Sequence, residues 1–276
     1  MDLLQIFILA ALQGLTEFLP VSSSAHLILA PQVLGYADQG LAFDVAVHLG
    51  TLAAVTSYFR RQIAAIIIDL SDSLFGSKQT TENSRMGWMI IVATIPVCIF
   101  GLLMKSLVET DLRSPLVIAT TTLIFGVMLY WADLKGKQER AEHEMKMRDA
   151  IIIGMFQAIA IIPGTSRSGI TITAGLLLGL TREAASRFSF LLSIPTILMS
   201  GGLVTLDLIK SDTAIAWSEL WLGALLSFFC AYLCIHLFLR FIERIGMLPF
   251  FIYRMLLGGI ILIIVLGSTP EMLSYS

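Results

Sequence analysis

Charged residues are scarce in this sequence. Lys, Arg, Asp and Glu together make up 14% of its 276 residues, whereas a soluble domain usually contains about 25%. The net charge is −2 and no run of basic residues is present, so no nucleic-acid partner is indicated. The composition therefore excludes an ordinary soluble domain and predicts a protein that is surrounded by membrane lipids.

Cysteine is rare, and the N-terminal segment lacks the basic residues of a cleavable signal. The three cysteines, Cys98, Cys230 and Cys234, lie in apolar segments, and neither their odd number nor their spacing fits a disulfide set or a zinc site. We interpret them as buried thiols. The chain begins with Met-Asp-Leu-Leu, so we expect its first apolar segment to stay in the protein.

Apolar residues, by contrast, make up 57% of the chain, and its mean hydropathy is +0.85. This composition predicts an all-α integral membrane protein, a polytopic helical bundle that forms a single membrane domain over residues 1–276. A spanning helix needs about 20 apolar residues. Segments of that length cover residues 40–59, 86–106, 115–132, 184–206, 217–239 and 249–268. Residues 61–72 are too few to span easily and predict an interfacial helix or an extension of the preceding span.

Two further apolar segments, residues 3–35 and 150–180, are interrupted near their middle by Pro20 and Pro163. Polar backbone at membrane depth is tolerated only where it is buried in protein or lines a cavity. We therefore expect each segment to enter the membrane as a helix, break, and return as a re-entrant pair.

The basic residues of the loops predict the orientation in the membrane. Most of them fall between residues 60–85, 133–149, 182–187 and 240–244. The remaining loops contain only Lys105, Arg113 and Lys210. All the basic loops lie on one side, the cytoplasmic side, if both interrupted segments are re-entrant. The first segment then enters from the outer face and the second from the cytoplasm.

The two interrupted segments also resemble each other. Residues 13–26 read QGLTEFLPVSSSAH and residues 157–171 read QAIAIIPGTSRSGIT, so each runs from Gln through an apolar helix to Pro and a serine cluster. Similar sequences in opposite orientations predict an inverted-topology repeat. The repeat cores are residues 1–59 and 150–206, and we expect their polar breaks to form one central site.

Both breaks have the features of an anion site. Small hydroxyl residues are favoured helix N-caps, and a helix that starts at membrane depth presents free backbone N–H groups and a positive dipole end. Arg167 adds a planar charged group that suits phosphate oxygens. The further substrate-binding candidates are Ser22, Ser24, Ser166, Ser168, Thr171 and Arg254. The alternatives are that the hydroxyls only satisfy backbone carbonyls and that Arg254 snorkels to the interface.

The first break adds groups that suit catalysis and metal binding. Glu17 follows Gln13 by four residues, so both lie on one helix face. Glu17, Ser23 and His26 in one stretch predict a base, a nucleophile and an acid. Glu17 could also bind a divalent cation, with Gln13 as a weaker ligand, in a site for phosphoryl transfer. A purely structural ion pair between Glu17 and Arg167 is the alternative.

These stretches carry a family resemblance. Residues 13–26 resemble the first signature of the undecaprenyl-diphosphate phosphatase family, the bacitracin-resistance proteins, in which Glu or Gln, three residues and Glu precede FLPVSS and a His. PGTSRSGIT is similar to the second signature of that family. FDVAVHLGT, FSFLLSIP and PFFIYR look like further family blocks, and we interpret His48, in the first of them, as structural or supporting. The resemblance covers nearly the whole chain.

The resemblance implies hydrolysis of a long polyprenyl diphosphate to the monophosphate, the carrier lipid of cell-wall glycans. It also implies a divalent cation, Mg or Ca, and an active site toward the outer, periplasmic face of the bacterial cytoplasmic membrane. Glu17 is similar to the indispensable acid of the first signature. Gln13 stands where many members have Glu, which weakens any mechanism that needs two carboxylates on the metal.

For such a reaction we expect Arg167 and the N–H groups of the serine clusters to bind the diphosphate. Ser23 is the candidate nucleophile, and either Glu17 or His26 would assist it. His26 could instead protonate the leaving phosphate, and a metal-activated water could attack in place of Ser23.

Two alternatives concern the function and the assembly. A transporter or flippase of an anionic lipid or small anion shares the broken helices and the midplane anion site, and a fold alone does not separate transport from hydrolysis. The motifs of acid-phosphatase-like lipid phosphatases are absent from the sequence. Gly258 and Gly259 could pack a homodimer or pack within one chain.

Overall fold

The computed structural model of the chain describes all residues except 77–80, 105–111, 113, 210–215 and 268–276. The described part is helical and contains no β-strand. Its α-helices are α1 (Leu3–Thr16), α2 (Ser23–Leu34), α3 (Leu41–Tyr58), α4 (Arg60–Leu74), α5 (Glu82–Leu103), α7 (Pro115–Lys135), α8 (Met147–Ile159), α9 (Arg167–Leu177), α10 (Arg182–Ile209), α11 (Trp217–Ile245) and α12 (Leu248–Gly267), with a 3-10 helix, η1 (Glu142–Glu144), before α8.

Five of these helices, α3, α5, α7, α11 and α12, are long and apolar enough to cross a membrane. They confirm the predicted all-α polytopic membrane fold. The remaining predicted span, residues 184–206, lies within α10, a continuous helix that contains Pro195. Residues 61–72 lie in α4, which follows α3 after the single residue Phe59. The basic residues Lys78, Lys105, Arg113 and Lys210, on which part of the predicted orientation depends, lie outside the described residues.

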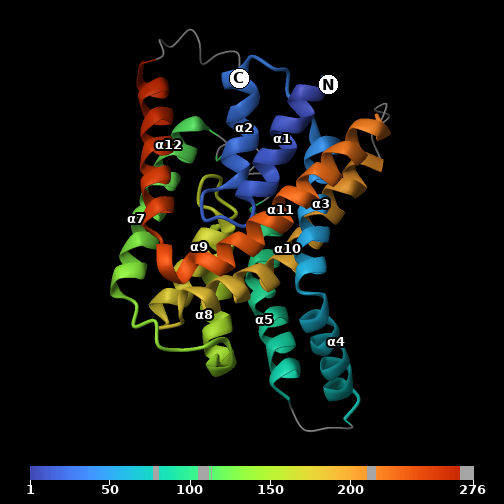
Figure 1. Cartoon of the computed structure of the whole chain (residues 1–276), viewed down its shortest axis with the longest axis vertical. Helices are drawn as coiled ribbons and strands as arrows, with labels where there is room; N and C mark the ends of the chain where they lie inside the picture. Colours follow the sequence, from blue (N-terminus) through green and yellow to red (C-terminus); the bar gives the residue numbers. More distant parts are fainter. Residues whose placement is uncertain (77–80, 105–111, 113, 210–215, 268–276) are drawn as a thin grey trace.

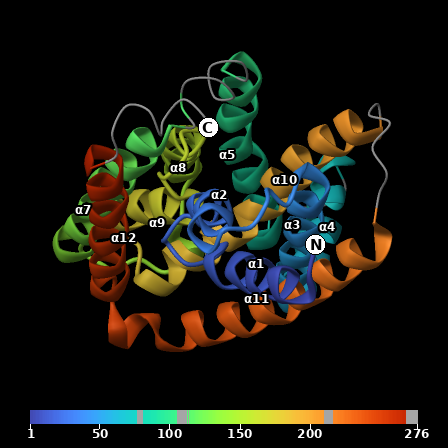
Figure 2. The same ribbon diagram turned by 90° about the horizontal axis from the view of Figure 1, so that it is seen from above.

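Both segments that were predicted to break do so. Residues 17–22 separate α1 from α2, and residues 160–166 separate α8 from α9. Figure 1 shows the α1–α2 pair in the upper half of the molecule and α8 in the lower half, with the two breaks meeting between them. Seen from above, α2 and α9 lie inside a ring of longer helices (Figure 2). The inverted symmetry of the two repeat cores stays a prediction.

The backbone of the two breaks is strained in the same way. Ser22 and Ser166, the residues that precede α2 and α9, have φ of 73° and 70°. A non-glycine residue in this left-handed region is uncommon and often marks a functional site. Gly164 also has a positive φ, of 87°, and a Cβ added there would collide with the side chain of Thr121 on α7. The second break is therefore pressed against α7.

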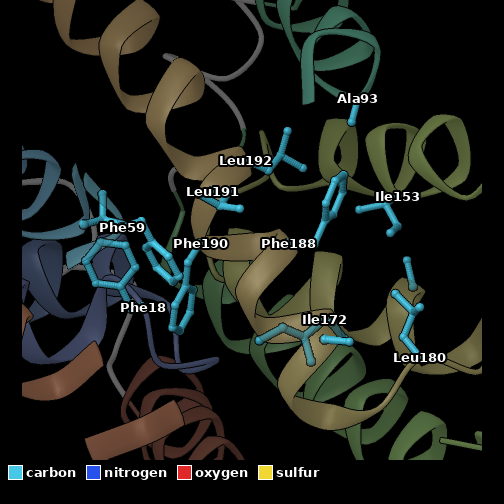
Figure 3. Close-up of a cluster of buried hydrophobic side chains, with 14 of the residues drawn as sticks. Phe18, Phe59, Ala93, Ile153, Ile172, Leu180, Phe188, Phe190, Leu191 and Leu192 are labelled. Carbon is cyan, nitrogen blue, oxygen red and sulfur yellow. The ribbon is translucent and has the colours of Figure 1, made fainter. Parts of the chain in front are cut away.

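The main hydrophobic cluster supports the first break from one side. Phe18 and Phe190 are fully buried, and their rings meet edge to face with centroids 5.2 Å apart, a favourable aromatic geometry. Figure 3 shows Phe59 beside them, with Phe188 and Leu192 further along α10. Phe18 directly follows Glu17 in the chain, so this packing fixes the position of the Glu17 backbone.

Glycines allow α11 to pack closely against α1 and α3. A Cβ on Gly14 would lie 2.7 Å from the Ser227 carbonyl oxygen, and a Cβ on Gly50 would collide with the backbone of Ala224. Gly258 packs in the same way within the chain, because a Cβ added there would lie 2.8 Å from Leu123 on α7. A Cβ added to Gly259 would meet no atom within 4 Å. Small residues at such contacts are typical of membrane helix bundles.

Candidate active site

Glu17 is the residue at which the two breaks meet. It follows the last turn of α1, and its side chain is 9% exposed. Its Oε1 accepts a hydrogen bond from Arg167 Nη2 at 2.9 Å. Its Oε2 accepts from Ser23 Oγ at 2.7 Å and from Gln13 Nε2 at 3.0 Å. The structure therefore brings together the carboxylate, serine, arginine and glutamine that the sequence singled out.

The contact between Ser23 and Glu17 has the geometry of a nucleophile and its base. Ser23 is the first residue of α2, so its hydroxyl lies at the helix end that carries the positive dipole. A nucleophilic hydroxyl and its base are expected within about 2.6–3.2 Å, and the two oxygens are 2.7 Å apart. Ser23 is partly exposed, so a substrate can approach its hydroxyl.

Arg167 forms the ion pair with Glu17 that was considered as an alternative. Its Nη1 also donates to the carbonyl oxygen of Ser189 at 3.1 Å. A guanidinium has five N–H donors. Within the described part of the chain, the Arg167 guanidinium uses its donors for these two hydrogen bonds. The remaining donors are available for phosphate oxygens, so the ion pair and a phosphate-binding role are compatible.

His26, which the sequence offered as a residue that could assist Ser23, makes its contacts elsewhere. Its Nδ1 is 2.7 Å from the carbonyl oxygen of Ser22, and its Nε2 is 2.5 Å from the hydroxyl of Tyr253 on α12. The helical turn from Ser22 to His26 brings the ring to the backbone carbonyl rather than to a side chain. With both ring nitrogens engaged elsewhere, Glu17 is the base that contacts Ser23.

The hydroxyls of the second break mostly satisfy the protein itself. Ser166 caps α9 by accepting from the Gly169 N–H at 3.2 Å. Ser168 donates to the Leu19 carbonyl oxygen at 2.9 Å, and Thr171 donates to that of Arg167 at 2.9 Å. Ser168 and Thr171 are each 1% exposed. For these two residues the geometry matches the structural alternative rather than the predicted substrate contact.

The N-terminus of α2, unlike that of α9, has no side-chain cap. Its N-cap, Ser22, makes no capping hydrogen bond with its side chain. The Ser22 hydroxyl instead lies 3.2 Å from the hydroxyl of Ser24, which is exposed. Backbone N–H groups at an uncapped helix start are suited to anionic oxygens. Ser22, Ser24 and the first turn of α2 therefore form the better candidate for phosphate binding.

Arg254 is buried rather than snorkelling to the interface, and its predicted contact with an anion stays a prediction. Its side chain is fully buried. Its guanidinium donates to five backbone carbonyl oxygens, those of Pro20, Thr121, Thr122, Gly164 and Thr165. All five of its donors are thus used, and the residue joins both breaks to α7. Sequence spacing gave no signal for partners so far apart in the chain.

The residues near Glu17 fit a cation that is shared with a substrate, not one enclosed by protein. Gln13 Oε1 is buried and has no hydrogen-bond partner in the described structure. No group of three or more His, Cys, Asp or Glu in the described residues is arranged to hold a metal. Mg is usually bound through one or two carboxylates together with substrate phosphates and waters. Glu17 and the free Gln13 oxygen can supply the protein part of such a set.

Two residues near the site, His48 and Tyr253, were not among the site residues predicted from the sequence. His48 on α3 places its Nε2 3.8 Å from Glu17 Oε2, while its Nδ1 lies 2.7 Å from the Asp44 carbonyl oxygen. Tyr253 contacts His26. Both belong to stretches that look like family blocks, FDVAVHLGT and PFFIYR, and this was the one signal that could have found them.

An acid, a serine and an arginine that converge from two broken helices inside a helical bundle define a polytopic membrane protein with an enclosed polar site for an anionic group. Residues 6–260 match the family described as bacitracin resistance protein BacA. The chain belongs to this family.

Its curated relatives are similar over nearly their whole length. The chain is 55% identical over 270 residues to undecaprenyl-diphosphatase 2 of Stutzerimonas stutzeri, which covers 97% of this chain and 100% of that protein. It is 57% identical over 261 residues to undecaprenyl-diphosphatase of Nitrosococcus oceani, and the match covers 95% of this chain and 98% of that protein. The identity to undecaprenyl-diphosphatase of Chromohalobacter salexigens is 57% over 263 residues, and the match covers 95% of this chain and 99% of that protein.

Proposed function

We propose that this protein hydrolyses undecaprenyl diphosphate to undecaprenyl phosphate and inorganic phosphate, which recycles the carrier lipid for peptidoglycan and other cell-wall glycans and confers bacitracin resistance. The relatives that carry the name undecaprenyl-diphosphatase support this function. The observation that carries it is the 2.7 Å contact between Ser23 Oγ and Glu17 Oε2, beside Arg167 on the same carboxylate. A binding protein for an anion needs the arginine but not a paired serine and base.

The proposed chemistry has two steps. Ser23 Oγ attacks the terminal phosphorus, Glu17 takes the hydroxyl proton, and the bond from that phosphorus to the bridging oxygen breaks. Undecaprenyl phosphate leaves with the bonding electrons as a phosphate dianion. Water then attacks the phosphoserine and gives a proton to neutral His26, while the Ser23 oxygen leaves and recovers its proton from Glu17. His26 afterwards returns its proton to the solvent. A water that attacks directly is the alternative nucleophile.

Arg167 and the first turn of α2 stabilise the charge of the transferred group in this mechanism. Phosphoryl transfer depends mainly on positioning and on neutralising the phosphate oxygens. Arg167 is already aligned by Glu17 and by the Ser189 carbonyl oxygen, so it needs little reorganisation. A divalent cation, Mg or Ca, held by Glu17 and Gln13 together with diphosphate oxygens, would add further neutralisation when bound.

Phosphate release from undecaprenyl diphosphate by the protein purified in detergent tests this function. We expect release in the presence of Mg or Ca, and near-complete loss in Arg167→Ala and in Ser23→Ala. Ser71→Ala is the matched control, because the Ser71 hydroxyl donates only to the Ile67 carbonyl oxygen on exposed α4. Loss in Ser23→Ala with retained lipid binding supports the serine as nucleophile, whereas retained release there supports attack by water.

Transport of an anionic lipid or small anion is the competing function. Two broken helices that meet near the middle of a bundle are typical of transporters, and Figure 1 shows that arrangement. Folded protein that binds the lipid but releases no phosphate, and that moves the lipid between the leaflets of a vesicle, would replace the hydrolase with a transporter.

We also propose that the protein lies in the bacterial cytoplasmic membrane with its site facing the periplasm and with the inverted repeats that the sequence predicts. Lys137, which is exposed in the loop after α7, then faces the cytoplasm. Lys137→Cys, in a protein whose three cysteines are replaced by Ala, should react with a membrane-impermeant maleimide only after the membrane is opened. Labelling of intact spheroplasts would reverse the orientation.

The oligomeric state is a separate proposal. Gly259 has open space around it, and a small residue on a lipid-facing helix surface allows a second copy to approach. A homodimer through α12 should lose affinity in Gly259→Leu, as measured by the mass of the protein in nanodiscs. An unchanged dimer would place the interface elsewhere, and a monomer in both proteins would exclude it.

A further inference from the structure

The contacts of His26 determine which of its ring nitrogens carries the proton. Nδ1 lies 2.7 Å from the carbonyl oxygen of Ser22, and a carbonyl oxygen only accepts hydrogen bonds. Nδ1 must therefore be protonated. In the neutral ring, Nε2 is then the acceptor, and the Tyr253 hydroxyl 2.5 Å away is its donor.

Tyr253 holds His26 by its ring as well as by its hydroxyl. The two rings are stacked, with centroids 5.6 Å apart and planes 13° from parallel. His26 is 7% exposed and Tyr253 is 42% exposed. Tyr253 therefore lies between the buried imidazole and the surroundings of the protein, and it limits both the rotation of the imidazole and its access to protons.

The position of Tyr253 is fixed by its neighbour in the chain. Arg254 is bound to carbonyl oxygens of both breaks and of α7, so the backbone of α12 cannot shift at this point without breaking those contacts. The phenol is consequently presented to His26 by a rigid element. A rigid second layer of contacts is what holds a catalytic group in its productive orientation.

We propose that Tyr253 is a positioning residue that holds the His26 ring in place, donates a hydrogen bond to its Nε2 and connects that nitrogen to external protons. This inference rests on the proposed diphosphatase function for the role of His26. The phenol serves both states of the ring, because it donates to neutral Nε2 and its oxygen accepts from protonated Nε2. Proton uptake proceeds when the phenol gives its proton to Nε2 and takes one from water, which leaves Tyr253 unchanged.

Tyr253→Phe tests the proposal, because it keeps the stacked ring and removes only the hydroxyl. We expect kcat for phosphate release to fall by about 10- to 100-fold, part of the usual contribution of a general acid or base. KM should change little, since Tyr253 makes no hydrogen bond to Arg167 or to the serines at the start of α2 in the described structure. The matched control is Tyr130→Phe, which removes the hydroxyl of a ring that stacks on Phe251 at 4.8 Å, and which should change neither constant.

A spectroscopic measurement separates this proposal from the proposed function. In protein labelled with ¹⁵N-histidine, and with the His26 signals assigned from His26→Gln, the ring should show protonated Nδ1 and unprotonated Nε2 at neutral pH. Tyr253→Phe should keep Nδ1 protonated, because the Ser22 carbonyl oxygen is unchanged, and should shift the Nε2 signal toward that of a nitrogen without a hydrogen bond. This outcome does not depend on turnover, so it stands even if the wild-type protein releases no phosphate.

Two results would overturn the proposal. A wild-type His26 that carries its neutral proton on Nε2 contradicts the assignment of the hydrogen bonds. A Tyr253→Phe protein with wild-type kcat, in a preparation that is active and loses activity in Arg167→Ala, shows that the hydroxyl has no part in the reaction.

Discussion

Compared side by side, the break between α1 and α2 and the break between α8 and α9 have the same backbone and different side chains. Each has a proline and then a serine with positive φ at the start of the returning helix, Ser22 in one and Ser166 in the other. The first break supplies Glu17 and Ser23, the proposed nucleophile, and the second supplies Arg167. The two breaks therefore share a backbone conformation, and the residues that differ between them determine the chemical groups that each contributes.

The glutamines at equivalent places in the two breaks show how the halves differ. Gln13 and Gln157 are both fully buried. Gln157 donates to the Ala93 carbonyl oxygen and accepts from Thr196, both at 3.3 Å. Gln13 donates to Glu17, but its Oε1 has no partner in the described structure. Since buried polar groups are normally paired, the unpaired oxygen distinguishes the first break, and it is the atom for which we propose a cation.

The largest expected effect comes from removing the residue that holds both breaks. Arg254→Met removes one donor from each of five buried carbonyl oxygens, and each oxygen that is left without any partner costs about 1–3 kcal/mol. We expect this protein to unfold at a much lower temperature in detergent or to fail to fold. Arg244→Gln, at an exposed position on α11, is the control for loss of an arginine. A stable Arg254→Met protein would mean that the breaks are held by other contacts.

Arg167→Lys should reduce activity next most strongly while leaving the fold intact. Lysine keeps the charge but cannot reach Glu17, the Ser189 carbonyl oxygen and a phosphate with one planar group. Loss of one well-placed charge-stabilising donor typically costs about 100- to 1000-fold in kcat, and we expect a change of that order in phosphate release. An active Arg167→Lys protein would show that only the charge of this residue matters.

Replacing each of the two glutamines by Ala, in separate variants, tests the difference between the breaks. Gln13→Ala should lower the rate and raise the Mg concentration needed for half-maximal activity, with little change in thermal stability. Gln157→Ala should instead lower the thermal stability and leave the Mg requirement unchanged, because it removes the buried hydrogen bonds of Gln157 with the Ala93 carbonyl oxygen and Thr196 and leaves a cavity. Metal titrations and unfolding curves of both proteins measure this. Equal metal dependence in the two variants would remove the distinction between a ligand-binding half and a structural half.

The smallest effect is expected at His48. Its Nε2 is 3.8 Å from Glu17 Oε2, which is too far for a hydrogen bond, so the two groups interact only through space. His48→Gln should lower kcat for phosphate release by less than about tenfold. A loss as large as that of Ser23→Ala would make His48 a direct participant in the reaction.

Local patterns in the sequence predicted what is local in the structure. Proline followed by serines located both breaks, hydropathy located the spans, and the four-residue spacing placed Gln13 and Glu17 on one face, where they are hydrogen-bonded. The contacts of His26 and Arg254 could not be obtained in this way. They join residues 227 and up to 234 positions apart, and such pairing follows from how the helices pack rather than from spacing along the chain.

The reach of Arg254 also sets the order in which the protein can mature. Its contact with the Pro20 carbonyl oxygen joins residues 234 positions apart, so the α1–α2 pair enters the membrane long before its partner on α12 has been synthesised. Until then, the Pro20 carbonyl oxygen lacks this donor, and an unpaired carbonyl at membrane depth is disfavoured. A nascent chain that stops before α12 therefore lacks the residue that joins its two breaks.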